Sequence, residues 1–318
     1  MLSIGDLPPF ELLSHDHIKK AGIILPTGQK GEFDESMVES PDVFYEPTLG
    51  CLVMIYTAYK GADETLEASH GYAVSQDGVH WTKKGRFFTG SGMNGTPDSH
   101  GVTGPTMVLH KGKYYLFYIG LTRSGYEGGT KSLCLAVADS FRDFLEGRAR
   151  RLGAVMRPGG DGWHQGAIWH PDFLQKDGIW YCLINCTGDD GRERTGYATA
   201  SRLEGPWTLS DKPLLDFIDE DTRGNQIAID PSAVQYGPYV VMSYGTVLRK
   251  DYTAIDEWCY TTMDEFPMGW RYGGVALYND QFYDSQYAHK PFLMKFQGRI
   301  FHYYTAVGGG KRQIGLAY

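Results

Sequence analysis

Five short segments of the chain place a variable, mostly polar residue directly before a proline. The residues before the five prolines are Ser40, Gly104, His170, Asp230 and Lys290. A repeat that serves structure alone would be expected to keep one residue at this position, but this chain varies it. Carboxylate and imidazole groups donate and accept protons, and they hydrogen-bond the polar groups of a ligand. We therefore expect the segments around the prolines to carry the chemistry of the protein.

Further residues of the same types lie close to these prolines. The residues seven positions before four of the prolines are Asp34, Asp98, His164 and Asp284. The residues two positions before the five prolines are Glu39, Thr103, Trp169, Ile229 and His289. An aspartate in such a loop can also serve structure alone, because its side chain accepts hydrogen bonds from backbone N–H groups in turns. From the residues alone, the three aspartates can therefore be interpreted either as site residues or as structural turn residues.

The prolines also mark an internal repeat, with spacings of 64, 66, 60 and 60 residues. An apolar run follows each proline, a glycine comes six to nine residues after it, and a second run rich in β-branched and aromatic residues comes next. A third run of similar composition completes every unit. Such runs are typical of strands. Each unit therefore predicts an antiparallel meander in which proline opens the first strand, where no hydrogen-bond donor of the sheet is lost.

A fourth strand-like segment follows the third run in the first four units, but the fifth unit stops at Tyr318. Residues 17–28, near the N-terminus, match the pattern of these fourth strands. We therefore expect the N-terminal segment to pair with the last strand of the fifth unit. Such pairing removes an open sheet edge and ties the two ends of the chain together.

The resulting prediction is an all-β fold: a single five-bladed β-propeller over residues 1–318, with blades that start near residues 37, 101, 167, 227 and 287. In such meanders the loops before the first strands and the loops between second and third strands lie on one face. Loops held around a central depression are the usual place for a site. The loops on this face are residues 29–40, 91–104, 159–170, 220–230 and 279–290, together with 60–69, 121–131, 187–194, 246–257 and 308–312.

Composition limits the classes of partner. The formal net charge is −8, which argues against the basic surface that nucleic acid or an anionic membrane requires. No stretch approaches the roughly 20 apolar residues of a membrane span, and Met1–Phe10 lacks the basic start and apolar run of a signal peptide. The five cysteines lie in apolar runs at no metal-ligand spacing, so we expect buried free thiols. These features predict a cytoplasmic protein with a neutral, polar ligand.

Taken together, the motifs resemble those of the five-bladed propeller glycosidases, namely family 43 glycoside hydrolases and their relatives in families 32, 68, 117 and 130. The resemblance covers the whole chain. It rests on the Phe-Asp-Glu-Ser and Glu-Ser-Pro-Asp-Val motifs of residues 33–43, on Ile229-Asp230-Pro231, on residues 196–207 and on Ala-His-Lys-Pro at 288–291. It implies hydrolysis of a glycosidic bond by groups that donate and accept protons on either side of it.

The resemblance also implies roles for individual residues. By the family 43 pattern, Asp34 is the general base and Asp230 modulates the pKa of the acid. The glutamate acid of family 43 is replaced here by His289. Family 117 enzymes, which release 3,6-anhydro-L-galactose from agar oligosaccharides, are similar in using a histidine acid, although their N-terminal helical domain is absent here. We therefore expect His289 to be the acid. The competing candidates are Glu64, Glu67 and Glu193.

Family 43 propellers often carry a calcium ion near a histidine of the fifth blade. The resemblance therefore makes His289 a candidate ligand for a structural calcium as well, whereas no cofactor is required for the reaction. The residues expected to bind the sugar are Glu39, Asp98, His164, Trp169, His170, Asp284 and Lys290. Aromatic side chains that could stack on sugar rings are Phe33, Trp163, Trp169, Tyr283 and Tyr287.

The implied function is an exo-acting, inverting glycoside hydrolase that acts on short oligosaccharides, similar to α-L-arabinofuranosidases and β-xylosidases. An anhydro-galactosidase-like hydrolase with a histidine acid is one alternative. Phosphorolysis is a second, and it would require several cations to converge on one point. A propeller that binds sugar without catalysis is a third.

Overall fold

The computed structural model describes residues 13–318 except residue 161, residues 216–224 and residues 249–250. The N-terminal ten residues considered above lie outside this range. The described chain is built almost entirely from β-strands, and its helical elements are short, as in α2 (Phe141–Leu145) and the 3-10 turn η2 (Asp63–Thr65). None of the described helices is both long and apolar enough to cross a membrane. The predicted all-β class is confirmed.

Three of the sheets are antiparallel meanders of four strands, in which each strand pairs with the next along the chain. The first contains β2 (Met37–Glu46), β3 (Cys51–Lys60), β4 (Glu67–Ser75) and β5 (Thr82–Thr89). The second contains β6 (Gly101–His110), β7 (Lys113–Leu121), β8 (Lys131–Ala138) and β9 (Arg150–Met156). The third contains β10 (Ala167–Lys176), β11 (Ile179–Thr187), β12 (Glu193–Ala200) and β13 (Thr208–Leu209). Four-stranded sheets of this kind are typical of propeller blades.

The fourth sheet has eight strands and contains two consecutive meanders. One consists of β14 (Asn225–Tyr236), β15 (Tyr239–Leu248), β16 (Ala254–Thr262) and β17 (Arg271–Leu277). The other consists of β18 (Tyr287–Phe296), β19 (Arg299–Gly308), β20 (Lys311–Ala317) and β1 (Lys20–Leu25). A single parallel pair, Ala254 with Tyr287, links the two. Because β1 pairs antiparallel with β20, the predicted pairing of the N-terminal segment with the last strand is confirmed.

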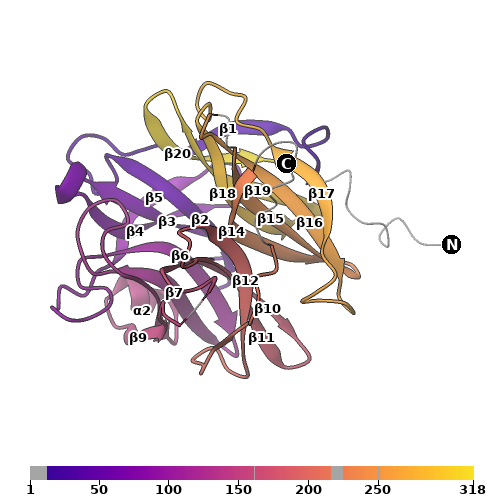
Figure 1. The fold of residues 1–318 in the computed structure, drawn as a ribbon. Helices are drawn as coiled ribbons and strands as arrows, with labels where there is room; N and C mark the ends of the chain where they lie inside the picture. The colour runs from indigo at the N-terminus through magenta and orange to yellow at the C-terminus, as the bar shows by residue number, and fades with distance from the viewer. Residues whose placement is uncertain (1–12, 161, 216–224, 249–250) are drawn as a thin grey trace.

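The first strands of the meanders contact one another in a closed cycle. β2 contacts β6, β6 contacts β10, β10 contacts β14, β14 contacts β18, and β18 contacts β2. Figure 1 shows β2, β14 and β18 near the middle of the view, whereas β5, β9 and β17 lie toward the outside. The residues that precede the prolines are therefore carried on inner strands that surround a common centre.

Every inner strand has a β-bulge at its proline. The register with the second strand shifts between residues 39 and 42, 103 and 106, 169 and 172, 229 and 232, and 289 and 292. The residue before the proline has positive φ in all five: 51° at Ser40, 55° at Gly104, 20° at His170, 54° at Asp230 and 54° at Lys290. A left-handed backbone costs a non-glycine residue about 1–2 kcal/mol. The fold therefore holds four non-glycine side chains in a strained conformation around the centre.

The position of the prolines differs in detail from the prediction. We expected them to open the first strands, but Pro41, for example, lies within β2. The missing N–H is tolerated there for another reason: a bulge leaves its extra residue outside the regular hydrogen-bond ladder.

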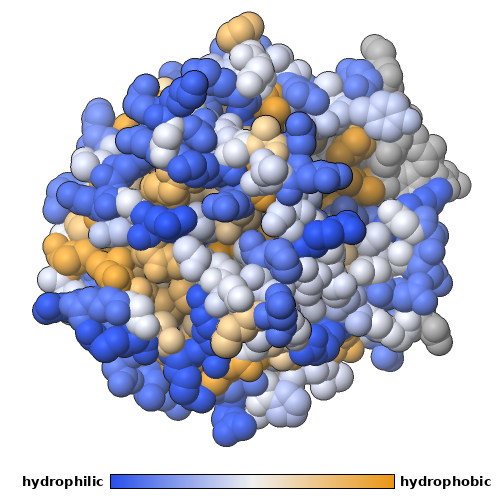
Figure 2. Space-filling model, turned by 90° about the vertical axis from the view of Figure 1, so that its left-hand side faces the viewer, coloured by the Kyte–Doolittle hydropathy of each residue, from blue (hydrophilic) through white to orange (hydrophobic). Residues whose placement is uncertain are grey.

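Apolar side chains fill the space between neighbouring sheets. The rings of Phe117 on β7 and Phe173 on β10 lie 4.1 Å apart between centroids, and both approach Trp207. Figure 2 shows a surface that is mainly hydrophilic, with apolar residues gathered in small patches. All five cysteines are buried and free, as predicted from their sequence positions. This packing makes a rigid support for the loops at the centre.

Candidate active site

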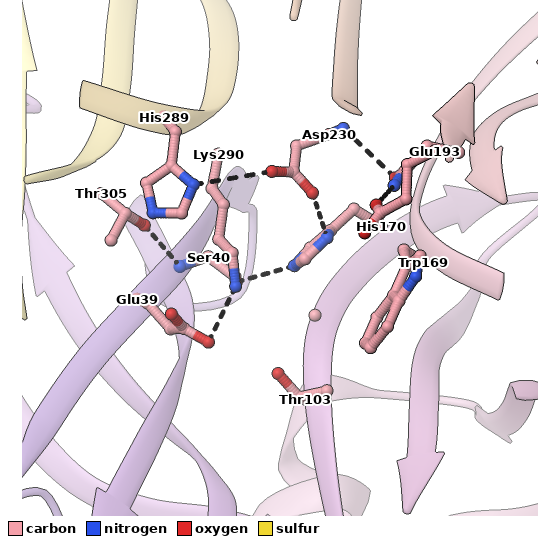
Figure 3. Close-up of polar contacts among 12 residues, drawn as sticks. Glu39, Ser40, Thr103, Trp169, His170, Glu193, Asp230, His289, Lys290 and Thr305 are labelled. Carbon is pink, nitrogen blue, oxygen red and sulfur yellow. Dashed lines mark hydrogen bonds and ion pairs between the residues drawn. The ribbon is translucent and has the colours of Figure 1, made fainter. Parts of the chain in front are cut away.

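The five bulges surround a small cavity. It is lined by the residues before the prolines, the prolines themselves and the residues after them, from Ser40 to Phe292. Its volume of about 30 Å³ is too small for a sugar ring but sufficient for a water molecule. A sugar is therefore too large to bind within this cavity. Figure 3 shows the polar residues around it, which come from several sheets and point toward a common centre.

Asp230 occupies a central position in this cluster. One carboxylate oxygen, Oδ1, contacts Nδ1 of His170, whose Nε2 lies 3.0 Å from Ser40 Oγ. The other oxygen, Oδ2, makes no hydrogen bond with any residue that the structure describes. Burial alone would raise the pKa of Asp230, but His170 and Lys290 outweigh burial and hold the pKa below its usual value. Asp230 is therefore ionised, and its Oδ2 is a buried carboxylate oxygen without a hydrogen-bond donor among the described residues.

His289 lies on the opposite side of Asp230 from His170 (Figure 3). Its Nδ1 is 3.8 Å from Asp230 Oδ2, and its Nε2 is 3.3 Å from Nη1 of Arg312. An arginine cannot accept a proton, so Nε2 must be the acceptor and Nδ1 carries the hydrogen of a neutral imidazole. Burial, Arg312 and Lys290 hold the pKa of His289 well below its usual value. His289 is thus an uncharged residue at neutral pH.

These surroundings do not suit a cation at His289. Arg312 occupies the side of Nε2, and the adjacent Lys290 adds a second positive charge. Across the described ranges, no group of three or more His, Cys, Asp or Glu side chains is placed to hold a metal ion. The residues at this position therefore do not fit the calcium ion that the resemblance implied.

Glu39 is a fully buried carboxylate with four donors. Its Oε1 accepts from Tyr59 at 3.1 Å and pairs with Lys290 Nζ at 3.0 Å. Its Oε2 accepts from Arg312 at 2.6 Å and from Tyr126 at 3.2 Å. Burial would raise the pKa of Glu39, but Lys290 and Arg312 hold it well below its usual value. A carboxylate with both oxygens occupied is suited to anchoring the cluster rather than to exchanging protons.

Lys290 connects three sheets at the centre. Its Nζ pairs with Glu39 on β2 and with Glu127, 3.1 Å away, in the loop between β7 and β8. Burial would lower the pKa of Lys290, but the two glutamates raise it well above its usual value. Tyr126 of the same loop lies over the guanidinium of Arg312 at 5.1 Å and is 42% exposed. This loop therefore reaches from β7 to the inner strands β2 and β18 and presents an exposed ring beside the cluster.

Glu193, at the start of β12, has the electrostatics of a proton donor. It is partly exposed, and its Oε2 accepts a hydrogen bond from Nδ2 of Asn185 at 2.7 Å. Burial, Asp230 and Glu127 raise the pKa of Glu193 to about 8. A carboxyl group with this pKa keeps its proton at neutral pH. The site thus combines a protonated Glu193 with an ionised Asp230, which is the pairing that acid–base catalysis requires.

The three aspartates seven residues before a proline have a different environment. Each accepts a hydrogen bond from a tyrosine on a second strand and pairs with a cation on an outer strand. The three groups, which we call blade clamps, are Asp34 with Tyr56 and Lys83, Asp98 with Tyr118 and Arg151, and Asp284 with Tyr304 and Lys20. Asp34 Oδ2, for instance, lies 2.6 Å from Lys83 Nζ and 3.3 Å from Tyr56 OH. Each clamp joins a loop to the second and outer strands of one meander.

The structure therefore brings together some of the predicted site residues and not others. Asp230, His289, His170, Lys290 and Glu39 meet at the centre, whereas Asp34, Asp98 and Asp284 lie in the blade clamps. Of the residues that the structure describes, none of these three aspartates lines the central cavity.

Of the remaining predicted residues, one lies beside the central cluster and the others lie away from it. Trp169 is drawn beside the cluster in Figure 3; its Nε1 donates to Thr187 Oγ1 at 3.1 Å, and Lys131 Nζ lies 4.8 Å from the ring centroid. His164 Nδ1 instead lies 2.8 Å from the carbonyl oxygen of Gly159 in its own loop. Trp163 is buried against Gly196 and donates to Ser210 O, so it packs a meander rather than binds a ligand.

Four residues of the cluster were missed by the sequence interpretation: Asn185, Tyr126, Glu127 and Arg312. The Tyr126–Glu127 pair and Arg312 fall within the predicted loops 121–131 and 308–312, although Arg312 lies in β20. A buried lysine and a buried glutamate each require partners, and this requirement could have directed attention to those loops. Asn185 had no such signal, because a single asparagine in an apolar strand reveals nothing about its neighbours.

Several solved structures with a similar fold are described as glycoside hydrolases. One described as a glycoside hydrolase has a TM-score of 0.75 and 18% identity, covering 95% of this chain and 92% of its own. A family 117 glycoside hydrolase from Zobellia galactanivorans has a TM-score of 0.67 and 16% identity, covering 96% and 90%. A thermostable family 43 glycoside hydrolase has a TM-score of 0.60 and 14% identity, covering 91% and 92%. No protein-family model and no curated protein sequence matches the chain.

These comparisons agree with the resemblance stated from the sequence motifs. The identities are low, so the likeness establishes the fold and does not by itself assign a reaction. The chain has the all-β fold, with sheets typical of propeller blades, that glycoside hydrolases of families 43 and 117 also have.

Proposed function

We propose that the protein is a five-bladed propeller glycoside hydrolase. The five bulged inner strands and the closed cycle of contacts between them support the blade count. The observation that carries the activity is that Glu193 and Asp230 both hydrogen-bond to Asn185 beside a centre to which several blades contribute. The pKa of Glu193 is raised and that of Asp230 is lowered, so one carboxyl group keeps its proton where the other is ionised. Hydrolysis of an acetal requires one group of each kind.

In this proposal Glu193 is the general acid and Asp230 the general base. Glu193 donates its proton to the glycosidic oxygen as the bond from that oxygen to the anomeric carbon breaks. Asp230 Oδ2 accepts a proton from the water whose oxygen bonds to the anomeric carbon. His170 contacts Asp230, and together with Lys290 it keeps Asp230 ionised. The assignment replaces Asp34 by Asp230 as the base and prefers Glu193 to His289 as the acid, because a neutral His289 held by Arg312 is a poor proton donor.

We further propose an exo-acting, inverting enzyme for short, neutral oligosaccharides. The loop of Tyr126 and Glu127 approaches β2 and β18 beside the cluster, which would narrow the opening and favour the end of a chain. Lys290 and Arg312 are both paired with Glu39, and Lys290 is also paired with Glu127, so two carboxylates compensate the two cations. This argues against an acidic sugar and against the free cation cluster that phosphorolysis would require.

A panel of aryl glycosides tests the proposal, with each substrate assayed with and without phosphate and with and without calcium. We expect release of the phenol without either addition, and loss of at least 100-fold in kcat/KM on substituting Glu193→Gln. NMR of the first-formed sugar should show inversion at the anomeric carbon. Dependence on phosphate would indicate a phosphorylase instead, and sugar binding without turnover of any substrate would indicate a binding module.

A further inference from the structure

Asn185 is a buried residue of β11 that uses both ends of its carboxamide. Its Oδ1 accepts the backbone N–H of Asp230 at 3.2 Å, and its Nδ2 donates to Glu193 Oε2 at 2.7 Å. The side chain is fully buried, so water does not compete for these bonds. One side chain therefore joins the carboxyl group of Glu193 to the backbone of Asp230, across the boundary between the third and fourth meanders.

Comparison with the other meanders shows that the two hydrogen bonds of Asn185, to Asp230 and to Glu193, have different roles. The residue of the second strand that pairs with the position before the bulge is Thr57, Ile119, Asn185, Gly245 or Thr305. Thr57 Oγ1 accepts the N–H of Gly104 at 2.9 Å, and Thr305 Oγ1 accepts the N–H of Ser40 at 3.0 Å. These are the same connection to the next inner strand that Asn185 makes to Asp230. A threonine is thus sufficient for the structural task, and the amide donor of Asn185 is additional to it.

The additional donor fixes the proton of Glu193. Because Oδ1 of Asn185 must face the N–H of Asp230, Nδ2 must face Glu193. An oxygen that accepts from Nδ2 acts as the carbonyl oxygen of a neutral carboxyl group. The proton of Glu193 is then carried by Oε1.

We propose that Asn185 is a positioning residue, which holds Glu193 with its proton on Oε1 and in fixed register with Asp230. The inference rests on the proposed function and adds a residue that acts through the acid. It predicts that removing the amide donor, while keeping the backbone connection, impairs proton donation to the leaving group and little else.

Asn185→Thr is the variant that makes this distinction, because the chain itself uses threonine at the matching positions. With aryl glycosides whose leaving groups are poor, we expect kcat/KM to fall about 10-fold to 100-fold, less than the loss from removing a general acid altogether. With 2,4-dinitrophenyl glycosides, which leave without protonation, we expect a change of less than about threefold. A purely structural residue would lower both by the same factor.

The pH dependence of kcat/KM provides a second, independent measurement of the role of Asn185. The Asn185 bond favours the ionised form of Glu193, so its loss raises the pKa of Glu193, and the alkaline limb of kcat/KM should move to higher pH. Thr57→Val, which removes the matching connection between the first and second meanders, is the control. It should lower the melting temperature without any dependence on the leaving group. Asn185→Ser serves in the same assays if Asn185→Thr does not fold.

An equal loss on both classes of leaving group, or an alkaline limb that does not move, would overturn the role of Asn185. Glu193→Gln in the same assays distinguishes a failure of the inference about Asn185 from a failure of the proposed function. If Glu193→Gln shows the selective loss and Asn185→Thr does not, only the inference about Asn185 fails. If Glu193→Gln also lacks leaving-group dependence, the acid itself has been assigned wrongly.

Discussion

The central cluster and the blade clamps are both built from buried acids and nearby cations, yet they differ in how their partners are supplied. In a clamp, the aspartate, the tyrosine and the cation belong to one meander, and Asp34, for instance, is held between Tyr56 and Lys83. In the cluster, Asp230 contacts His170 of the third meander and faces His289 of the fifth. Buried acids are present in both regions. The central cluster differs from the structural ion pairs of the clamps because its side chains come from several meanders.

Backbone strain follows the same division. Ser40, His170, Asp230 and Lys290 have positive φ at the bulges, whereas Asp34, Asp98 and Asp284 do not appear among the described residues with positive φ. Strain held in place by surrounding structure is a mark of functional positions. The clamps need no such strain, because a turn aspartate meets a strand tyrosine in ordinary conformations.

The largest expected difference between the two regions is in catalysis. Asp230→Asn should lower kcat/KM by about 1,000-fold or more, because the amide cannot accept a proton from water. Asp34→Asn should lower it by less than about 10-fold, since the clamp lies outside the cluster. Steady-state kinetics on the best aryl glycoside, with circular dichroism to verify folding, measures both. A larger loss for Asp34→Asn than for Asp230→Asn would reverse the comparison.

Stability should show the next largest difference. Lys290→Met leaves the buried Glu39 with one cation fewer, which costs about 3–5 kcal/mol for a buried pair. Lys83→Met removes a cation whose side chain is 27% exposed, so water can partly replace it and a loss of about 1–2 kcal/mol is expected. Urea unfolding of both variants gives the free energies. Adding Glu39→Gln to Lys290→Met should restore part of the loss, and no restoration would argue against the pairing.

The pH dependence of kcat/KM should depend on residues of the central cluster and not on the blade clamps. In the proposed reaction Glu193 must be protonated, and its pKa is raised to about 8, so kcat/KM should fall about 10-fold per pH unit above pH 8. Below that pH the proton is present and this limb is flat. The substitution Asp34→Asn should leave the limb in place. An alkaline limb that shifts with Asp34→Asn would connect the clamp to the chemistry after all.

The smallest effect concerns the one glycine among the five bulges. A Cβ at Gly104 would lie 3.1 Å from His170 Cδ2 at a φ of 55°, so Gly104→Ala should cost about 1–2 kcal/mol and lower activity a few-fold by displacing His170. Gly112→Ala is the matched control, with a φ of 74° and open space around the new Cβ. Gly112→Ala should lose a similar amount of stability but no activity. Equal activity in the two variants would indicate that His170 has no role in the site.

The sequence predicted the architecture well because its signals are local. Prolines, turn glycines and alternating apolar residues each act within a few positions, so the meanders and the pairing of β1 with β20 could be predicted. The bulges were not predicted, because a left-handed conformation at Ser40 or Asp230 leaves no trace in the residue type. Only Gly104, at one of five equivalent positions, hinted at it.

The site was harder to predict because its contacts join distant residues. Asp34 and Asp230 look alike in the sequence: both are acids in loops on the same face, close to an inner strand. Their roles differ because the bulge turns Asp230 toward the centre, while Tyr56 and Lys83 hold Asp34 within its own meander. Glu193 and Asn185 lie on different strands from Asp230, so their coupling to it depends on how the third and fourth meanders pack.

In the proposed reaction the glycosidic bond is cleaved between Glu193 and Asp230. A crystal structure of the Glu193→Gln variant with an uncleaved oligosaccharide would show where the scissile bond lies. We expect the glycosidic oxygen to lie within hydrogen-bond distance of the residue 193 amide, and Asp230 Oδ2 to face the anomeric carbon through a water molecule. A sugar bound with its scissile bond beside Asp34, or away from the bulged inner strands, would contradict it.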